Sequence, residues 1–438
     1  MNRENRRAAF HTLGCKVNQY ETEAMKKIFR ERGYEIVGEQ EFADVYVINT
    51  CTVTAVADRK SRQYIRRMKK VNPDSIVAVT GCYAQINPQE VEEIHGVDII
   101  AGTGEKHKIP DYIDGLAKAS GGCLEEFVEM GPVASTDSRT RAYIKIQEGC
   151  NRFCSYCVIP YARGPVRSRP LENIREEAER LIAAGYKELV LTGINTALYG
   201  MEQNPEEFGL EPVLEMINDL PGDFRIRLSS LEPAVVNSEY VKKLFRFDKL
   251  CRHLHMSAQS GSDRVLAAMN RPYDREGYMD LVKTLCSFDP CYGLSTDIIV
   301  GFPGETERDF EDSCRLVAHC GFCKTHVFKY SKRPGTKAAD MPGQISPQVK
   351  NDRSDRLQNT AGEASKAFFR MNLDEARRGR TQQVLLEEVT GDGKYITGYT
   401  GNYIRTYIPY SEKLELNTFV QVRLEELFRD GMTGSVVL

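Results

Sequence analysis

Three cysteines stand close together in the stretch GCNRFCSYC, which runs from Gly149 to Cys157. A structural zinc site or an electron-transfer cluster normally takes four protein ligands, and this stretch supplies three. Three thiolates can hold three irons of a [4Fe–4S] cluster and leave the fourth iron open for a substrate, much as a catalytic zinc site keeps one position open. From these residues alone, two alternatives stay open: a zinc site with a distant fourth ligand, and three buried core cysteines.

A second set of three cysteines is spread along the N-terminal part of the chain. Cys15 lies in LGCKVNQYETE, Cys51 in NTCTVTAVADRK and Cys82 in TGCYAQ. Each follows a predicted strand by one or two residues and precedes a predicted helix. In a parallel sheet these points lie at the carboxyl edge, where α/β proteins bind ligands. The sequence thus predicts that three thiols converge without a fourth, although three unrelated buried cysteines remain an alternative.

The composition narrows the class of protein. A chain of 438 residues with 41% apolar content is expected to form about two to four globular domains. The formal charge of −3 argues against a uniformly basic nucleic-acid binder. The N-terminal MNRENRRAAF has no apolar signal core, and no segment approaches the roughly 20 apolar residues of a membrane span. We therefore expect a cytoplasmic protein without membrane contact, whose thirteen cysteines are reduced and favour metal ligation.

Short apolar strands alternate with amphipathic helices in the first part of the chain, which predicts a parallel α/β sandwich domain over residues 1–128. The expected strands are Ala8–Leu13, Val45–Asn49 and Ile76–Thr80, and the expected helices are Tyr20–Arg32, Ala57–Lys70 and Pro88–His95.

A second βα series predicts a domain over residues 136–370, which ends in the charged helix Val349–Arg370. Six βα units with right-handed crossovers form a partial (β/α)6 barrel, two units short of the full eight. Its expected strands are Tyr143–Gln147, Glu188–Leu191, Arg225–Ser229, His253–Met256, Leu294–Val300 and Thr325–Phe328.

Residues 373–438 change character, because short strands occur there without a long helix. The pattern predicts a small β-barrel of the oligonucleotide-binding sort. Tyrosines on these strands could stack on bases, but strand tyrosines are as often core or edge residues; they are Tyr395, Tyr399, Tyr403 and Tyr407. The expected strands are Gln383–Val389, Tyr395–Tyr399, Ile404–Ile408, Phe419–Leu424 and Thr433–Leu438.

Polar or glycine-rich loops follow the predicted barrel strands, at the end where barrel active sites are built. Cys150 follows the first strand, TGIN the second, SSLEP the third, AQSGS the fourth and DIIVGFPGET the fifth. Any one of these loops could be an ordinary turn with a helix cap. Their common position at one end of one barrel favours a binding site.

The spacing C-x-x-x-C-x-aromatic-C, with Tyr156 as the aromatic residue, resembles the motif of radical S-adenosylmethionine enzymes. This resemblance implies that S-adenosylmethionine binds the open iron of the Cys150/Cys154/Cys157 cluster and is cleaved there to a carbon radical. The residues expected to contact this cofactor are Tyr156, Thr192, Gly193, Asn195, Glu232, Gln259, Asp297 and Phe302.

From Arg7 to the C-terminus the chain resembles the methylthiotransferases, which have a cluster-binding domain, a radical domain and a C-terminal TRAM domain. The resemblance implies a second, auxiliary [4Fe–4S] cluster on Cys15, Cys51 and Cys82, whose open iron carries the sulfur delivered to the substrate. LGCKVN and YSKRPGT (330–336) resemble the MtaB branch, which adds a methylthio group to C2 of N6-threonylcarbamoyladenosine at position 37 of tRNA. Ser257 departs from the family pattern, which usually has proline there.

Three alternatives remain. The first is the same chemistry on isopentenyladenosine in tRNA or on ribosomal protein S12, which the LGCKVN and YSKRPGT motifs disfavour. The second is a different radical enzyme whose auxiliary cluster transfers electrons, which would share the barrel but would not need the basic helix. The third is a non-catalytic iron–sulfur RNA-binding protein, which would have no use for an open iron.

Basic residues beside both cysteine sets indicate an RNA partner, expected to be a tRNA anticodon stem-loop. Four lie on one face of the predicted helix after Cys51, and two follow the Cys150/Cys154/Cys157 set; they are Arg59, Arg62, Arg66, Lys69, Arg163 and Arg167. A solvated helix face is the alternative. We also expect a flavodoxin- or ferredoxin-like electron donor and a monomer.

The remaining cysteines and two histidines are expected to be structural. His253 and His255 flank a barrel strand and are predicted to pack and hydrogen-bond rather than to bind a metal. The cysteines in this group are Cys123, Cys251, Cys286, Cys291, Cys314, Cys320 and Cys323.

Overall fold

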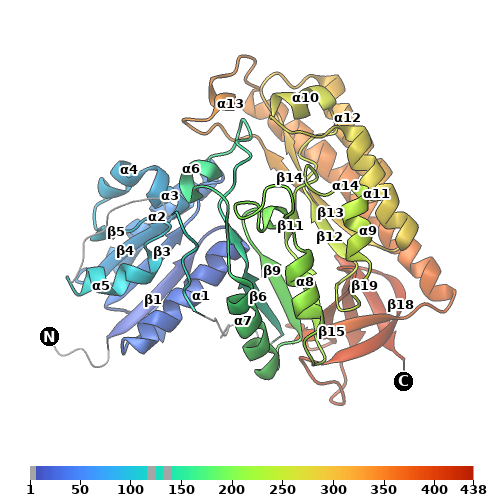
Figure 1. Cartoon of the computed structure of the whole chain (residues 1–438), viewed down its shortest axis with the longest axis horizontal. Coiled ribbons are helices and arrows are strands. Elements are labelled where there is room, and N and C mark those ends of the chain that lie inside the picture. Colours follow the sequence, from blue (N-terminus) through green and yellow to red (C-terminus); the bar gives the residue numbers. More distant parts are fainter. Residues whose placement is uncertain (1–5, 116–124, 132–139, 438) are drawn as a thin grey trace.

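The computed structural model describes residues 6–115, 125–131 and 140–437. Figure 1 shows three units, which are an N-terminal parallel sheet, a curved parallel sheet in the middle and a small closed barrel at the C-terminus. This arrangement confirms the predicted fold class. Cys123 and residue 136, the expected start of the second domain, lie outside the described residues, so the domain limits stay predictions. None of the described helices has the length and apolar content that a membrane span needs.

The N-terminal sheet has the strand order β2-β1-β3-β4-β5, and all neighbouring strands are parallel. Every residue of its central strand is buried, as expected for a strand that helices cover on both faces. The three predicted strands are confirmed, and β2 and β5 are too short to show a pattern. The strands are β1 (Arg7–Thr12), β2 (Glu35–Val37), β3 (Val45–Thr50), β4 (Ile76–Gly81) and β5 (Ile99–Ile100). The helices are α1 (Lys16–Glu31), α2 (Ala55–Val71), α3 (Cys82–Ile86), α4 (Pro88–Glu92) and α5 (Ile109–Ile113), with a 3-10 turn, η1, at Lys106–Lys108.

The central unit is a partial barrel of parallel strands, as predicted, in which the third of the six expected strands continues past its predicted end and is divided into β10 and β11. It consists of the sheets β6-β9-β10 and β11-β12-β13-β14, which are joined by a parallel bridge between Ile226 and Leu250. The strands are β6 (Arg141–Lys145), β9 (Glu188–Thr192), β10 (Arg225–Leu228), β11 (Ser230–Leu231), β12 (His253–Met256), β13 (Gly293–Val300) and β14 (Lys324–Lys329), and a separate hairpin pairs β7 (Gln147–Glu148) with β8 (Arg167–Ser168).

Helices cover the outer face of this partial barrel. The long helix α14 extends beyond both predicted ends, Val349 and Arg370. Its C-terminal extension to Arg377 reaches the terminal barrel. The helical elements are α6 (Ile159–Arg163), α7 (Leu171–Ala183), η2 (Thr196–Leu198), α8 (Glu211–Asn218), α9 (Ser238–Leu244), α10 (Asp263–Ala268), α11 (Arg275–Phe288), α12 (Glu307–Cys320), α13 (Lys337–Asp340) and α14 (Pro347–Arg377).

The two faces of the central sheet differ in chemistry. Apolar residues such as Ile144, Leu191 and Ile298 pack outward against the covering helices in the largest core of the molecule. Because side chains alternate along a strand, the residues between them face the interior of the barrel. These inward residues are strongly polar, unlike the branched apolar residues that fill a complete eight-stranded barrel; they include Arg141, Glu188, Arg227, His253, His255, Ser295 and Asp297.

The C-terminal unit is a closed barrel with the strand order β15-β16-β17-β19-β18, and its five strands were all predicted. It packs against the end of the central sheet at which the strands begin, where Arg227 donates to the carbonyl oxygens of Thr400 and Gly401. Tyr403 stacks on His253 with ring centroids 4.6 Å apart. The strands are β15 (Gln382–Val389), β16 (Tyr395–Thr400), β17 (Arg405–Pro409), β18 (Phe419–Phe428) and β19 (Gly431–Val436).

Candidate functional site: two cysteine sites facing one cavity

The three N-terminal cysteines meet at one edge of their sheet. Strands β1, β3 and β4 are neighbours in register, so Cys15, Cys51 and Cys82 follow the carboxyl ends of three adjacent strands. Gly14 has a φ of +104°, and a Cβ placed on it would lie 2.8 Å from the Sγ of Cys51. The loop that carries Cys15 therefore lies directly against Cys51, and the structure brings the predicted set together.

The environment of these thiols suits a bound metal cluster better than free cysteine. Burial, together with the neighbouring Cys82 and Cys15, raises the pKa of Cys51 to about 12. A buried thiol with this pKa stays protonated unless a cation stabilises the thiolate. Arg163 supplies part of that stabilisation, because its Nε lies 3.3 Å from the Sγ of Cys82.

Arg163 also belongs to a buried charge network that joins the N-terminal sheet to the central one. Its guanidinium lies 2.7 Å from Glu21 and 2.5 Å from Glu148, and its side chain is 0% exposed. Lys106 pairs with Glu21, and Lys145 pairs with both carboxylates. Three cations thus face two carboxylates, and the remaining positive charge would be balanced by a cysteinate.

This burial corrects two predicted RNA contacts. Arg163 is held inside the network, and Arg167 is 6% exposed and donates to the carbonyl oxygen of Arg163. A guanidinium enclosed by protein cannot reach a phosphate of bound RNA, so the prediction is wrong for both residues. The sequence showed basic residues near a cysteine set, and the tertiary structure turns them inward.

The second cysteine site is formed by a single loop after β6. Burial raises the pKa of Cys150 to about 11 and that of Cys157 to about 12, and mutual repulsion with Cys154 contributes in both. The backbone N–H of Cys157 donates to the carbonyl oxygen of Cys154, and the N–H of Ile159 points at the Sγ of Cys157 at 3.4 Å. The three thiols are half-buried and close together, as their spacing predicted.

Asn195 and Glu232 meet beside Cys150. The Nδ2 of Asn195 donates to the carboxylate of Glu232 at 2.6 Å, and Arg152 and Arg271 pair with the same carboxylate at 2.8 and 2.7 Å. The Oδ1 of Asn195 is buried, and no donor among the described residues reaches it. A buried acceptor without a partner is costly, so this atom fits a ligand that brings its own donor, such as the amino group of S-adenosylmethionine.

The other predicted cofactor residues lie around the same end of the barrel. The Oε1 of Gln147 accepts from the backbone N–H of Asn195, and a Cβ on Gly193 would lie 2.9 Å from that Oε1 atom. The side chain of Thr192 is buried at the end of β9. Phe302 is 0% exposed, so only the backbone of its turn is available for the expected contact with adenine.

A cavity of about 190 Å³ is lined by residues that lie next to a cysteine of each site in the sequence. One wall is the loop after Cys51, and another is Tyr156, between two cysteines of the second site. Gln259, whose φ is +64°, lies on the cavity wall at the end of the central sheet. The remaining lining residues are Val53, Thr54, Asp297, Ile299, Phe328, Lys329, Tyr330 and Ser331.

The segment YSKRPGT joins the two sides of this cavity. Arg333 pairs with Asp58 at 2.7 Å and donates to the hydroxyl of Thr52 at 2.6 Å, and all three residues are buried. The hydroxyl of Ser331 accepts from the backbone N–H of Ala55. These contacts tie the loop after Cys51 to the end of β14, which explains how a motif late in the chain takes part in the site.

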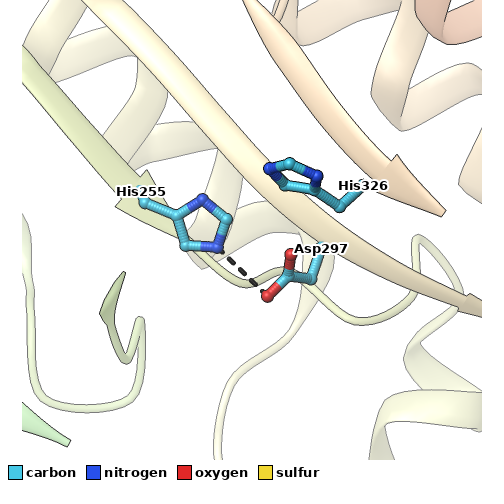
Figure 2. A group of neighbouring side chains, drawn as sticks. All are labelled: His255, Asp297 and His326. Carbon is cyan, nitrogen blue, oxygen red and sulfur yellow. Dashed lines mark hydrogen bonds and ion pairs between the residues drawn. The ribbon is translucent and has the colours of Figure 1, made fainter. Parts of the chain in front are cut away.

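His255, Asp297 and His326 form a polar group on the inner face of the central sheet (Figure 2), with ligating atoms all within 4.8 Å of one another. His255 hydrogen-bonds as predicted, while His326 was missed as a site residue. Its inward position on β14 follows from strand alternation, and that pattern could have found it. Ser257, in place of the usual proline, donates to Asp297 at 2.8 Å.

The basic helix after Cys51 is α2, and its side chains differ in what they contact. Arg62 donates to Tyr83 at 3.0 Å, and Lys69 pairs with Asp98 at 2.9 Å. Arg59 and Arg66 are exposed, and no hydrogen bond or ion pair engages them within the described part of the chain. Of the four predicted RNA-binding cations on this helix, Arg59 and Arg66 are therefore free for a partner, and Arg62 and Lys69 already have partners within the protein.

Two family models match the chain. Residues 7–102 match the uncharacterized protein family UPF0004, and residues 144–317 match the radical SAM superfamily. The matched ranges contain all six cysteines of the two sites.

Curated relatives are similar over nearly the whole length. The threonylcarbamoyladenosine tRNA methylthiotransferase MtaB of Bacillus subtilis is 42% identical over 95% of this chain and 93% of its own. The enzyme of the same name from Thermotoga maritima is 37% identical over 96% of this chain and 95% of its own. A tRNA-2-methylthio-N(6)-dimethylallyladenosine synthase of Clostridium botulinum is 34% identical over 97% and 96%.

Among solved structures, the radical S-adenosylmethionine methyltransferase TsrM from Kitasatospora setae superposes with a TM-score of 0.58 at 16% identity, over 77% of each chain. That likeness concerns the fold alone. The sequence relatives show more, and the chain belongs to the radical S-adenosylmethionine methylthiotransferase family. It is accordingly an enzyme that uses [4Fe–4S] clusters and S-adenosylmethionine.

Proposed function

We propose that this protein adds a methylthio group to C2 of N6-threonylcarbamoyladenosine at position 37 of tRNA. One observation carries the proposal: residues that neighbour a cysteine in each of the two sets line the same cavity, Val53 and Thr54 after Cys51 on one side and Tyr156 on the other. The full-length similarity to enzymes named for threonylcarbamoyladenosine supports this substrate.

The cysteines divide between two clusters in this proposal. Cys150, Cys154 and Cys157 hold the cluster that binds S-adenosylmethionine, and Cys15, Cys51 and Cys82 hold the auxiliary cluster. When bound, these groups supply the one-electron chemistry and the sulfur that are needed to functionalise an aromatic C–H bond, which no ordinary acid–base group can activate. The chain itself orients the two sites toward each other and encloses the cavity between them.

The proposed cofactor contacts follow from the local geometry. Asn195 offers its unpartnered Oδ1 to the amino group, and Glu232 keeps acceptor capacity for a ribose hydroxyl beside its two arginine partners. Tyr156 and Gln259 line the cavity. The backbone around Thr192, Gly193 and Phe302 forms the rest of the cofactor-binding surface. Asp297 lies on the cavity wall that the cofactor and the substrate share.

The proposal also names partners. Arg59 and Arg66 bind phosphates of the anticodon stem-loop. Arg62 and Lys69 also contact phosphates once they release their partners within the protein. An electron donor of the flavodoxin or ferredoxin kind reduces the clusters, and the enzyme acts as a monomer in the cytoplasm.

Nucleoside mass spectrometry of tRNA tests the substrate. Deletion of the gene should abolish 2-methylthio-N6-threonylcarbamoyladenosine, and the wild-type gene, but not a Cys82→Ala variant, should restore it. In vitro, the purified holoenzyme should methylthiolate a stem-loop with threonylcarbamoyladenosine and leave one with isopentenyladenosine unchanged. An unaltered methylthio level in the deletion strain would mean that the substrate is a different one.

A further inference from the structure

Arg163 reaches from the central barrel into the N-terminal domain. It ends α6, in the segment that follows Cys157, and α6 packs against α3, which begins at Cys82. The Nε of Arg163 donates to the Sγ of Cys82 at 3.3 Å, and the arginine side chain is 0% exposed. A side chain from the segment of one cysteine site thus contacts a cysteine of the other, shielded from water.

Asn18 extends this contact to the rest of the N-terminal cysteine set. It lies on α1 and is 1% exposed, and its Oδ1 accepts from the guanidinium of Arg163. Its Nδ2 donates to the carbonyl oxygens of Leu13 at 2.6 Å and of Thr50 at 3.0 Å. Leu13 and Thr50 stand just before the first two cysteines of the set. Arg163 therefore meets one cysteine loop directly and the other two through a single amide side chain.

The buried network around Arg163 carries an excess of positive charge. Three cations share two carboxylates, and all five side chains are buried; they are Arg163, Lys106, Lys145, Glu21 and Glu148. Charges act strongly on one another in such an environment, because little water screens them. A [4Fe–4S] cluster gains a negative charge on reduction, and its potential depends on the charge around it and on hydrogen bonds to its sulfurs. The network therefore lies where it can stabilise a reduced cluster on the N-terminal cysteines.

We propose that Arg163 is a positioning residue of the auxiliary cluster, which orders the three cysteine loops and favours the reduced state of the cluster. The inference rests on the proposed assignment of Cys15, Cys51 and Cys82 to that cluster. Because Arg163 belongs to the radical domain, the auxiliary cluster has this environment only while the two domains are packed together. A residue of the domain that holds one cluster thus sets the potential of the other.

An ion pair that only holds the domains together is the alternative. Such a pair needs Glu21 and Glu148 and has no need of Cys82. In the structure, both terminal nitrogens of Arg163 contact the carboxylates or Asn18, and the Nε donates to the thiol. A planar guanidinium can serve all these acceptors at once, which the ammonium of a lysine cannot do. An interaction that matters for stability alone predicts no change in the potential of the cluster when Arg163 is replaced.

Anaerobic redox titration followed by EPR spectroscopy tests the proposal, with dithionite as the reductant. Measurements in a Cys154→Ala background report the auxiliary cluster alone, and measurements in a Cys82→Ala background report the radical cluster alone. Arg163→Gln is added to both backgrounds. Arg163→Lys and Glu21→Gln are added to the first background only.

The exposed pair of Arg175 and Glu179 on α7 supplies matched controls. Arg175→Gln and Glu179→Gln make the same changes of charge where water screens them. Both should leave the potential of the auxiliary cluster unchanged. The iron content of every protein shows whether the cluster is retained.

Arg163→Gln should lower the midpoint potential of the auxiliary cluster, because the reduced cluster loses a buried cation and a hydrogen bond. We expect a change of about tenfold or more in the reduction equilibrium, which is about 59 mV for a one-electron couple. Glu21→Gln should raise the potential, because it removes a negative charge from the same network. Arg163→Lys should give a potential between that of the unaltered background and that of Arg163→Gln. The radical cluster should shift less than the auxiliary cluster in Arg163→Gln.

An unchanged potential in Arg163→Gln at full cluster content would overturn the proposal. Shifts of the same sign in Arg163→Gln and Glu21→Gln would also overturn it, because a packing defect does not follow the sign of the charge removed. If Arg163→Gln does not retain the cluster, Arg163→Lys and Glu21→Gln decide, since the proposal requires a lower potential in the first and a higher one in the second.

Failure of the cysteine assignment shows differently. The Cys154→Ala protein would then contain no cluster at all, and the assignment and the role of Arg163 would both be wrong. A cluster that is present with an unshifted potential leaves the proposed function intact and rejects the role of Arg163 alone.

Discussion

The two cysteine sites are built in opposite ways. Cys150, Cys154 and Cys157 come from one loop, whose own backbone N–H groups point at its cysteines. Cys15, Cys51 and Cys82 come from three loops that only the order of a parallel sheet brings together. The first site is determined by local sequence, and the second depends on the packing of a whole domain.

An arginine lies beside each site, and the two arginines also differ. Arg271 pairs with Glu232 at 2.7 Å and donates to Tyr156 at 3.1 Å within the central barrel. Arg163 extends from the radical loop into the other domain, where it contacts Cys82 and Glu21. The auxiliary site therefore depends on the interface between domains, and the radical site does not.

Removal of one cysteine from each site should separate the two functions, with the largest effect expected here. Cys154→Ala should abolish the reductive cleavage of S-adenosylmethionine. Cys82→Ala should retain that cleavage and lose methylthio transfer. Each variant should lose about four of about eight irons per chain, because each cluster has four. Iron analysis and release of 5′-deoxyadenosine give the measurements, and loss of cleavage in both variants would contradict the separation.

Arg163→Gln should destabilise the interface that holds the auxiliary site. It leaves Glu21 and Glu148 with less compensating charge in a buried network, and breaking such a network costs about 3–5 kcal/mol. Anaerobic urea titration measures the loss. Arg175→Gln, which breaks an exposed pair with Glu179 on α7, is the control and should change stability by about 0.5 kcal/mol or less. Similar losses of stability in both variants would show that the buried network stabilises the protein no more than an exposed ion pair does.

Gly14→Ala should affect the auxiliary site alone. The new Cβ would meet the Sγ of Cys51 at 2.8 Å, and the φ of +104° is unfavourable for alanine. Strain of this kind costs about 1–3 kcal/mol, so we expect partial loss of one cluster and an unchanged radical site. Gly33→Ala, at another positive φ with no atom within 4 Å of the Cβ, controls for backbone strain. Equal iron content in both variants would place Cys15 further from Cys51 than the structure has it.

The smallest effect is expected on the basic helix beside the auxiliary site. Arg59→Gln and Arg66→Gln should each weaken tRNA binding a few-fold and reduce the slope of log affinity against log salt by about one, as for a lost phosphate contact. Lys69→Gln should change it less, because Lys69 already pairs with Asp98. Binding curves at several salt concentrations give the slopes. Identical slopes in all three variants would show that α2 does not contact the RNA.

Much of the fold was predictable because its signals are local. The alternating strands and helices, the six strands of the partial barrel and the five of the terminal barrel follow from hydrophobic period and turn residues. Short strands such as β2 and β5 were not predicted, because two or three residues are too few to show a hydrophobic period. The burial of Arg163 and Arg167 also escaped, since a basic residue looks the same in sequence whether it faces solvent or an ion pair 142 positions away.

The sequence by itself determined the loop that carries Cys150, Cys154 and Cys157, because ligands so close together in the chain can adopt few geometries. It also determined that three further cysteines end three strands. Only the tertiary structure decided that Tyr156 and the loop after Cys51 line one cavity and that His255, Asp297 and His326 meet inside the barrel. The physical reason is that such contacts depend on how whole sheets pack, and the free energy of that packing is distributed over many residues far from the site.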